Sequence, residues 1–161
     1  SSSRTSKAKN SIQRQCQRIS HCRTSMITYL DTSLFVKLVI DEIGSEQAEE
    51  IWNVSSTLGS SMVLYVESRA ALAAANRQGR INDANLVKAK SILEGLHSQL
   101  YVVEVTSKLV KMAAELAEEF SLRGYDSIHL ASAISMKADV FASSDESLSA
   151  AARANGFHVI V

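Results

Sequence analysis

Several features that many chains rely on are scarce in this sequence of 161 residues. It has no proline and only six glycines, which excludes collagen-like, proline-rich and long linker segments. Its only two cysteines are Cys16 and Cys22, so the chain beyond them has neither a disulfide framework nor a thiolate metal site. No apolar run approaches the roughly 18 residues of a membrane span. These absences predict a compact, helix-rich protein of the reducing cytoplasm, without a membrane partner.

The net charge of the chain is zero, because the charges of a basic and an acidic part cancel. Residues 1–25 hold six of the 17 basic residues and none of the 17 acidic ones, which leaves 11 basic and 17 acidic residues after residue 25. The resulting charge of −6 argues against a general electrostatic grip on nucleic acid, which normally needs a basic face. A polyanionic substrate would have to be reached through local Lys and Arg side chains or through bound cations.

The basic part, residues 1–25, is rich in Ser and Arg and lacks the apolar pattern of a core. Such a leader fits an organelle transit peptide, a cloning remnant, or a start codon assigned too early. We favour the last two and expect the leader to be disordered or non-native. Met26 is then the natural start, and residues 26–161, at 46% apolar residues for the whole chain, are enough for one domain.

Strand and helix patterns alternate from residue 26 onward. Short strands are expected at 26–31, 58–62, 101–105, 139–142 and 157–161, and helices at 32–40, 45–54, 63–78, 82–98, 106–120, after Asp126, and at 145–155. Asp126 is expected to cap its helix, and Arg123-Gly124 to end the preceding one. This alternation predicts an α/β sandwich with a mainly parallel sheet of about four or five strands.

Four acids occupy similar positions: Asp31, Glu67, Asp126 and Asp145 each lie at a strand end or in the first turns of a helix. Helix capping is the common explanation for an Asp at such a place. Glu67 is different, because it lies beside an alanine-rich helix face, where unpaired acids are rare. Asp31 and Asp145 follow strands, so they belong at the carboxyl edge of a parallel sheet, where sites collect.

The chemistry of four converging acids would be specific. Carboxylates crowded into one pocket repel each other and stay ionised together only when cations join them. Hard oxygen ligands favour Mg²⁺, with Mn²⁺ as a second candidate. Such a site can activate a water and screen a phosphate, which makes hydrolysis of a phosphodiester bond the natural reaction.

Four motifs carry a resemblance to a known family. They are Tyr29-Leu30-Asp31-Thr32-Ser33-Leu34, Val66-Glu67-Ser68-Arg69, Gly124-Tyr125-Asp126-Ser127-Ile128-His129-Leu130-Ala131, and Phe141-Ala142-Ser143-Ser144-Asp145 with Leu148 and Ala151-Ala152. Together and in this order they resemble the PIN domains, most closely the VapC-type toxins of toxin-antitoxin systems. Each motif alone is weak evidence; the ordered set is much stronger.

The resemblance implies a three-layer, PIN-like sandwich and a Mg²⁺-dependent endoribonuclease that cleaves RNA. It implies that Asp31, Glu67, Asp126 and Asp145 line the metal site, and that Ser143, where the family usually has Thr, supports it. It also implies a cognate antitoxin and a homodimer. An alternative is a catalytically silent PIN-like domain that only binds a partner.

Several side chains near the motifs stay open at this stage. Ser33 could support the metal or only cap the next helix, and His129 fits a buried structural histidine better than a base or ligand. Glu146 could be a fifth carboxylate of the site or a solvent-exposed one. Lys37, Arg69 and Arg123 could hold phosphates. A phosphoacceptor of the receiver type is excluded, because adjacent acids before the first helix and a Lys after a late strand are both missing.

Overall fold

The computed structural model describes residues 26–160 as a five-stranded sheet flanked by helices. The strands are β1 (Ile27–Leu30), β2 (Thr57–Ser61), β3 (Tyr101–Val103), β4 (Val140–Ala142) and β5 (His158–Ile160). All neighbouring strands are parallel, in the order β3-β2-β1-β4-β5. The predicted α/β fold with a parallel sheet is confirmed. The leader and residue 161 lie outside the described residues, so the predictions made for them stay predictions.

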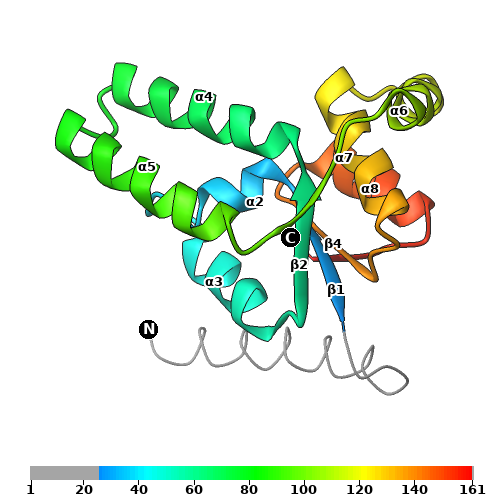
Figure 1. Cartoon of the computed structure of the whole chain (residues 1–161), viewed down its shortest axis with the longest axis horizontal. Coiled ribbons are helices and arrows are strands. Elements are labelled where there is room, and N and C mark those ends of the chain that lie inside the picture. The colour runs from blue at the N-terminus through cyan, green and yellow to red at the C-terminus, as the bar shows by residue number, and fades with distance from the viewer. Residues whose placement is uncertain (1–25, 161) are drawn as a thin grey trace.

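Helices cover both faces of this sheet (Figure 1). In the described part of the chain they are α2 (Thr32–Val36), α3 (Ser45–Val54), α4 (Val63–Arg77), α5 (Asp83–His97), α6 (Ser107–Phe120), α7 (Gly124–Ser135) and α8 (Glu146–Ala154). Helices α2 to α5 pack on one face and α6 to α8 on the other. No helix among residues 26–160 has the length and apolar character needed to cross a membrane.

Successive side chains of β1 point to opposite faces of the sheet and so feed two cores. Leu30 belongs to the apolar cluster with Leu34 and Phe35. Tyr29 belongs to the other cluster, where its ring stacks on Phe141 at 5.2 Å between centroids. The central strand is therefore buried on both sides, as expected in a three-layer sandwich.

The strand order creates a switch point between β1 and β4. The chain runs outward from β1 through β2 to β3, and then returns to place β4 and β5 on the other side of β1. In parallel α/β sheets, sites form outside the carboxyl ends of the strands at such a point. Here the residues that follow β1 and β4 are Asp31 and Ser143. The backbone N–H of Asp31 donates to the backbone carbonyl of Ala142 at 3.0 Å.

Two predicted helix boundaries around residue 124 were wrong. Helix α6 ends through Ser121, which adopts a left-handed conformation at φ 53°, and not through Gly124. Helix α7 then begins at Gly124 with Arg123 as its cap, so Asp126 lies inside the first turn. After Ser121 only Leu122 and Arg123 lie between the two helices. Gly124 can therefore be the first residue of α7, because a glycine is tolerated at the start of a helix. The predicted helix 32–40 is also shorter, because α2 ends at Val36 and turns continue to Ile40.

Candidate active site

Asp31 is the most deeply buried of the four predicted acids, at 4% exposed. It occupies the cap position of α2, yet its carboxylate accepts no capping bond from that helix. Instead its Oδ2 accepts hydrogen bonds from the hydroxyls of Ser33 at 2.7 Å and Ser143 at 2.6 Å. Both serines predicted to support the site therefore contact Asp31 directly.

The same two hydroxyls also hold the loop that follows β4. Ser33 Oγ accepts the backbone N–H of Ser144 at 2.9 Å, and Ser143 Oγ accepts that of Asp145 at 3.0 Å. Each serine hydroxyl thus donates a hydrogen bond to Asp31 and accepts one from a backbone N–H of the loop. This arrangement fixes the carboxylate of Asp31 and the position of Asp145 together.

Glu67 reaches the site from α4. Its Oε2 accepts a hydrogen bond from the hydroxyl of Thr32 at 2.7 Å and lies 2.6 Å from Nε2 of His129. The same His129 nitrogen is 3.8 Å from Oδ1 of Asp31. One imidazole nitrogen therefore faces both carboxylates.

His129 is buried, as expected, but its ring belongs to the site. It is 1% exposed, and its Nδ1 lies 2.7 Å from the hydroxyl of Tyr29, which in turn accepts the backbone N–H of Ser61 at 3.1 Å. Burial lowers the pKa of His129, but the hydrogen bond to Glu67 and the charge of Asp31 outweigh it, so the pKa is raised. Burial likewise opposes ionisation of Glu67, and the bond to His129 overcomes it and lowers the pKa of Glu67.

Asp126 and Asp145 form a second pair around Arg123. The guanidinium donates from Nε to Oδ2 of Asp126 at 2.8 Å, and its Nη2 lies 3.6 Å from Oδ2 of Asp145. The hydrogen bond and charge of Asp126 raise the pKa of Arg123, with a further contribution from Asp145. The charge of Arg123 also lowers the pKa of Glu67, which places the two pairs within electrostatic reach of each other.

Helix capping explains only one of the four acids. Asp145 accepts the backbone N–H of Leu148 at 2.8 Å through Oδ1, a true capping bond. Asp31 lies at a cap position without making that bond, Asp126 lies inside a helix, and Glu67 is the fifth residue of α4. Three carboxylates therefore converge without serving a helix end.

The donor chemistry fits a divalent ion. Among residues 26–160, Oε1 of Glu67 and Oδ1 of Asp126 have no hydrogen-bond partner, and Oδ1 of Asp31 has only the 3.8 Å contact with His129. These are hard oxygen ligands, which suit Mg²⁺ or Mn²⁺. No three His, Cys, Asp or Glu side chains of the described residues are gathered closely enough to form a ready-made ion site. The carboxylates are grouped around His129 and Arg123 instead, as mutual repulsion requires.

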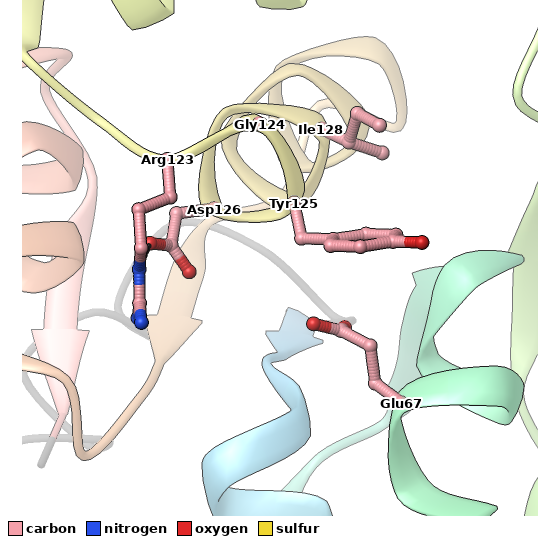
Figure 2. Close-up of a pocket in the computed structure, with 6 residues that line it drawn as sticks. All are labelled: Glu67, Arg123, Gly124, Tyr125, Asp126 and Ile128. Carbon is pink, nitrogen blue, oxygen red and sulfur yellow. Dashed lines mark hydrogen bonds and ion pairs between the residues drawn. The ribbon is translucent and has the colours of Figure 1, made fainter. Parts of the chain in front are cut away.

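A pocket opens beside these acids between α4 and α7. Its volume is about 580 Å³, and it is lined by Glu67, Arg123, Gly124, Tyr125, Asp126 and Ile128. Figure 2 shows the ring of Tyr125 extending from α7 above the side chain of Glu67, with Arg123 and Asp126 on the left. Two of the four acids thus form part of its wall.

The other charged side chains singled out from the sequence behave differently from one another. Glu146 is exposed, as expected of a side chain that points to solvent. Arg69 bonds to the hydroxyl of Tyr65 at 2.8 Å and pairs with Glu94, away from the acids. Lys37 donates to Ser144 at 2.9 Å and so touches the loop of the site. Of these four side chains, only Arg123 pairs with the predicted acids.

Sequence reasoning missed three contributions to this site. Tyr29 orients His129, Thr32 bonds to Glu67, and Tyr125 lines the pocket. All three lie inside the motifs, beside a predicted acid or two residues from one. Adjacency to the acids was the available signal, but a strand residue such as Tyr29 reaches the site only because its side chain lies on the sheet face that α7 covers, where it meets His129.

Comparison with known proteins agrees with the fold and the motifs. The PIN domain family model matches residues 28–154. Ribonuclease VapC45 of Mycobacterium tuberculosis is 38% identical over 110 residues, which are 68% of this chain and 76% of that protein.

Two solved structures show the same fold at low sequence identity. Mycobacterium tuberculosis VapC20, a toxin that cleaves the sarcin-ricin loop, has a TM-score of 0.61 at 22% identity, over 77% of this chain and 94% of that one. A toxin-antitoxin complex from Klebsiella pneumoniae has a TM-score of 0.52 at 17% identity, over 73% and 86%. Curated relatives of the chain include VapC-type ribonucleases, and the chain belongs to the PIN-domain family.

Proposed function

We propose that this protein is an endoribonuclease, the toxin of a toxin-antitoxin pair, which hydrolyses RNA phosphodiester bonds at the acids Asp31, Glu67, Asp126 and Asp145. The observation that supports the proposal is the pairing of Asp31 and Glu67 around His129 and of Asp126 and Asp145 around Arg123, with three of the four carboxylates not used for capping. The alternative of a catalytically silent binding domain is not favoured, because the curated relative is a ribonuclease.

Divalent-metal dependence is general among PIN-domain ribonucleases, and we propose Mg²⁺ for this chain, with Mn²⁺ as the second candidate. The four acids would hold the ion, with Ser33 and Ser143 orienting Asp31. A bound ion would supply positive charge against the phosphate and favour ionisation of a water. The chain's own contribution is to hold the carboxylates ionised and correctly turned, through Ser33, Ser143, Thr32 and His129.

The test compares purified Asp31→Asn and Asp126→Asn proteins with the parent on labelled RNA in Mg²⁺ and in EDTA. We expect cleavage by both variants to fall by at least about 100-fold, since loss of even an outer partner of a metal site costs about 10- to 100-fold. The matched control is Glu146→Gln, which removes an exposed carboxylate one residue from Asp145. If either aspartate variant keeps the parent's circular dichroism spectrum and the parent's rate, the site assignment is wrong.

An antitoxin partner is the second part of the proposal. One structural neighbour is a toxin-antitoxin complex, and the acidic pocket of this chain suits a partner that brings a basic side chain to it. The expected result is that a protein encoded beside this chain co-purifies with it and suppresses RNA cleavage. The predicted homodimer is checked separately by light scattering of the isolated protein.

A further inference from the structure

Tyr125 is an aromatic side chain without a structural task. Its side chain is 53% exposed although it lines the pocket beside the acids. Among the described residues its hydroxyl has no hydrogen-bond partner and its ring contacts no other aromatic ring, whereas Tyr29 and Tyr65 have both. The fold therefore keeps a flat apolar surface open to solvent at the mouth of the site.

The position of this ring limits what can lie on it. Tyr125 immediately precedes Asp126, and Figure 2 shows its ring above the side chain of Glu67. Ile128 adds a second apolar side chain to the lining. The volume of about 580 Å³ lies within the roughly 300–1,000 Å³ of small-ligand sites. A group in this pocket would lie between the ring and two of the four acids.

Charge decides which part of an RNA fits there. Glu67 and Asp126 are acidic side chains and disfavour a phosphate beside them, and the only cation of the lining, Arg123, is already paired. A nucleobase is uncharged, flat and apolar on its faces, and it stacks well on an aromatic side chain. A base inside a duplex has both faces covered, so the base on Tyr125 must be unpaired.

We propose that the pocket between α4 and α7 is a nucleobase subsite, in which one unpaired base next to the cleaved phosphodiester stacks on the ring of Tyr125. This inference rests on the proposed ribonuclease function and deepens it. Tyr125 is then a substrate-positioning residue: stacking fixes the nucleotide so that its phosphate reaches the acids.

The test uses the RNA that the parent cleaves, shortened to about eight nucleotides around the cut and made resistant with 2′-O-methyl groups. Binding is measured for the parent, Tyr125→Phe, Tyr125→Leu and Tyr125→Ala. We expect Leu and Ala to weaken binding by about 10-fold, and Phe to stay within about twofold of the parent, because stacking needs the ring and not the hydroxyl. Tyr101→Ala, which removes an exposed tyrosine on β3, is the matched control and should change nothing.

A second measurement separates stacking from a general loss of structure. Abasic sites are introduced one at a time into the oligonucleotide. One position should weaken binding to the parent about as much as Tyr125→Ala does, and should weaken binding to Tyr125→Ala no further. Mg²⁺ affinity and thermal stability of the three Tyr125 variants should equal those of the parent.

Each contrary result has a distinct meaning. If the parent cleaves RNA and Tyr125→Ala binds it as tightly, or if Leu restores binding as fully as Phe, the subsite is wrong while the proposed function stands. The same holds if Tyr125→Ala changes the oligomeric state in light scattering, since the pocket would then be an interface between copies of the chain. If the parent neither binds nor cleaves RNA, the function and the subsite both fail.

Discussion

Three of the four carboxylates, those of Asp31, Glu67 and Asp126, have one oxygen held by hydrogen bonds and another that accepts none from the described residues. Ser33 and Ser143 hold Asp31, Thr32 and His129 hold Glu67, and Arg123 holds Asp126. Such outer bonds set the direction of the remaining oxygens before a ligand arrives, which lowers the cost of binding. The network is therefore what separates this group of acids from an ordinary acidic surface.

Arg123 should compete with a divalent ion for Asp126 and Asp145. We expect Arg123→Gln to tighten Mg²⁺ binding in calorimetry by about two- to fivefold, the range of an exposed ion pair. Lys37→Gln is the matched control, because Lys37 bonds to Ser144 and pairs with none of the four acids. Unchanged or weaker Mg²⁺ binding by Arg123→Gln would show that the guanidinium does not occupy the place of the ion.

The His129–Glu67 pair should make the stability of the metal-free protein depend on pH. The pKa of His129 is raised above 6.5, so its contribution is complete below pH 6.5 and is lost as the pH rises through the folded value. The pKa of Glu67 is lowered below 4.5, so its contribution is complete above pH 4.5 and is lost as the pH falls through the folded value. The pair therefore stabilises the metal-free protein most between pH 4.5 and pH 6.5.

Urea unfolding in EDTA from pH 5.5 to 9 measures this effect. The free energy of unfolding of the parent should fall as the pH rises above 6.5, and that of His129→Asn should be flatter over the same range. Glu67→Gln should reduce the fall, because it removes the main partner that raises the pKa of His129. Parallel curves for the parent and His129→Asn would contradict a charged pair.

At the scale of elements, helix α7 does most to build the site. Its cap residue Arg123 and its first turns supply Tyr125, Asp126 and His129, all directed at the switch point between β1 and β4. This is possible because the helix packs against the sheet with small buried residues such as Ala131 and Ala133. One helix thereby delivers an acid, a cation, an imidazole and an exposed ring within seven positions.

Helix α8 allows the capping role of Asp145 to be separated from its proposed metal role. Asn caps helices about as well as Asp, whereas Ala costs about 1 kcal/mol of stability. We expect Asp145→Asn to keep the parent's stability in urea and Asp145→Ala to lose about 1 kcal/mol. Both should weaken Mg²⁺ binding by about 10-fold or more. If Asp145→Asn binds Mg²⁺ like the parent, Asp145 serves only as a cap.

Strand β2 shows how an element with little strand signal forms. Its residues 57–61 are small and polar, yet Gly59, Ser60 and Ser61 are buried. Ser60 donates to the backbone carbonyl of Leu30 at 2.6 Å, and a Cβ at Gly59 would require the end of the Met136 side chain, at the cap of α7, to shift. Small residues therefore fit where β2 lies against the end of α7. Neighbours of this kind, and not the local pattern, decide the strand.

For the molecule as a whole, the excess of acids after residue 25 predicts that divalent ions stabilise the fold. Mg²⁺ at 100 times its dissociation constant should add about 2.7 kcal/mol and raise the melting temperature by on the order of 10 °C. Asp31→Asn should lose most of this increase. NaCl at equal ionic strength is the control, and an equal increase with NaCl would mean that general screening acts and not a site.

The sequence alone determined the order of strands and helices, the parallel sheet and the four acids, because each depends on local periodicity or on a motif of adjacent residues. It misplaced the start of α7, where a left-handed Ser121 and not a glycine turns the chain. Only the tertiary structure decided which groups neutralise the acids: His129 beside Glu67 and Asp31, and Arg123 between Asp126 and Asp145. It also decided that Tyr125 stays open beside them. Apart from the local Arg123–Asp126 pair, these pairings join residues far apart in the chain, and they exist only where the sheet order brings the ends of β1 and β4 and the starts of α4 and α7 together.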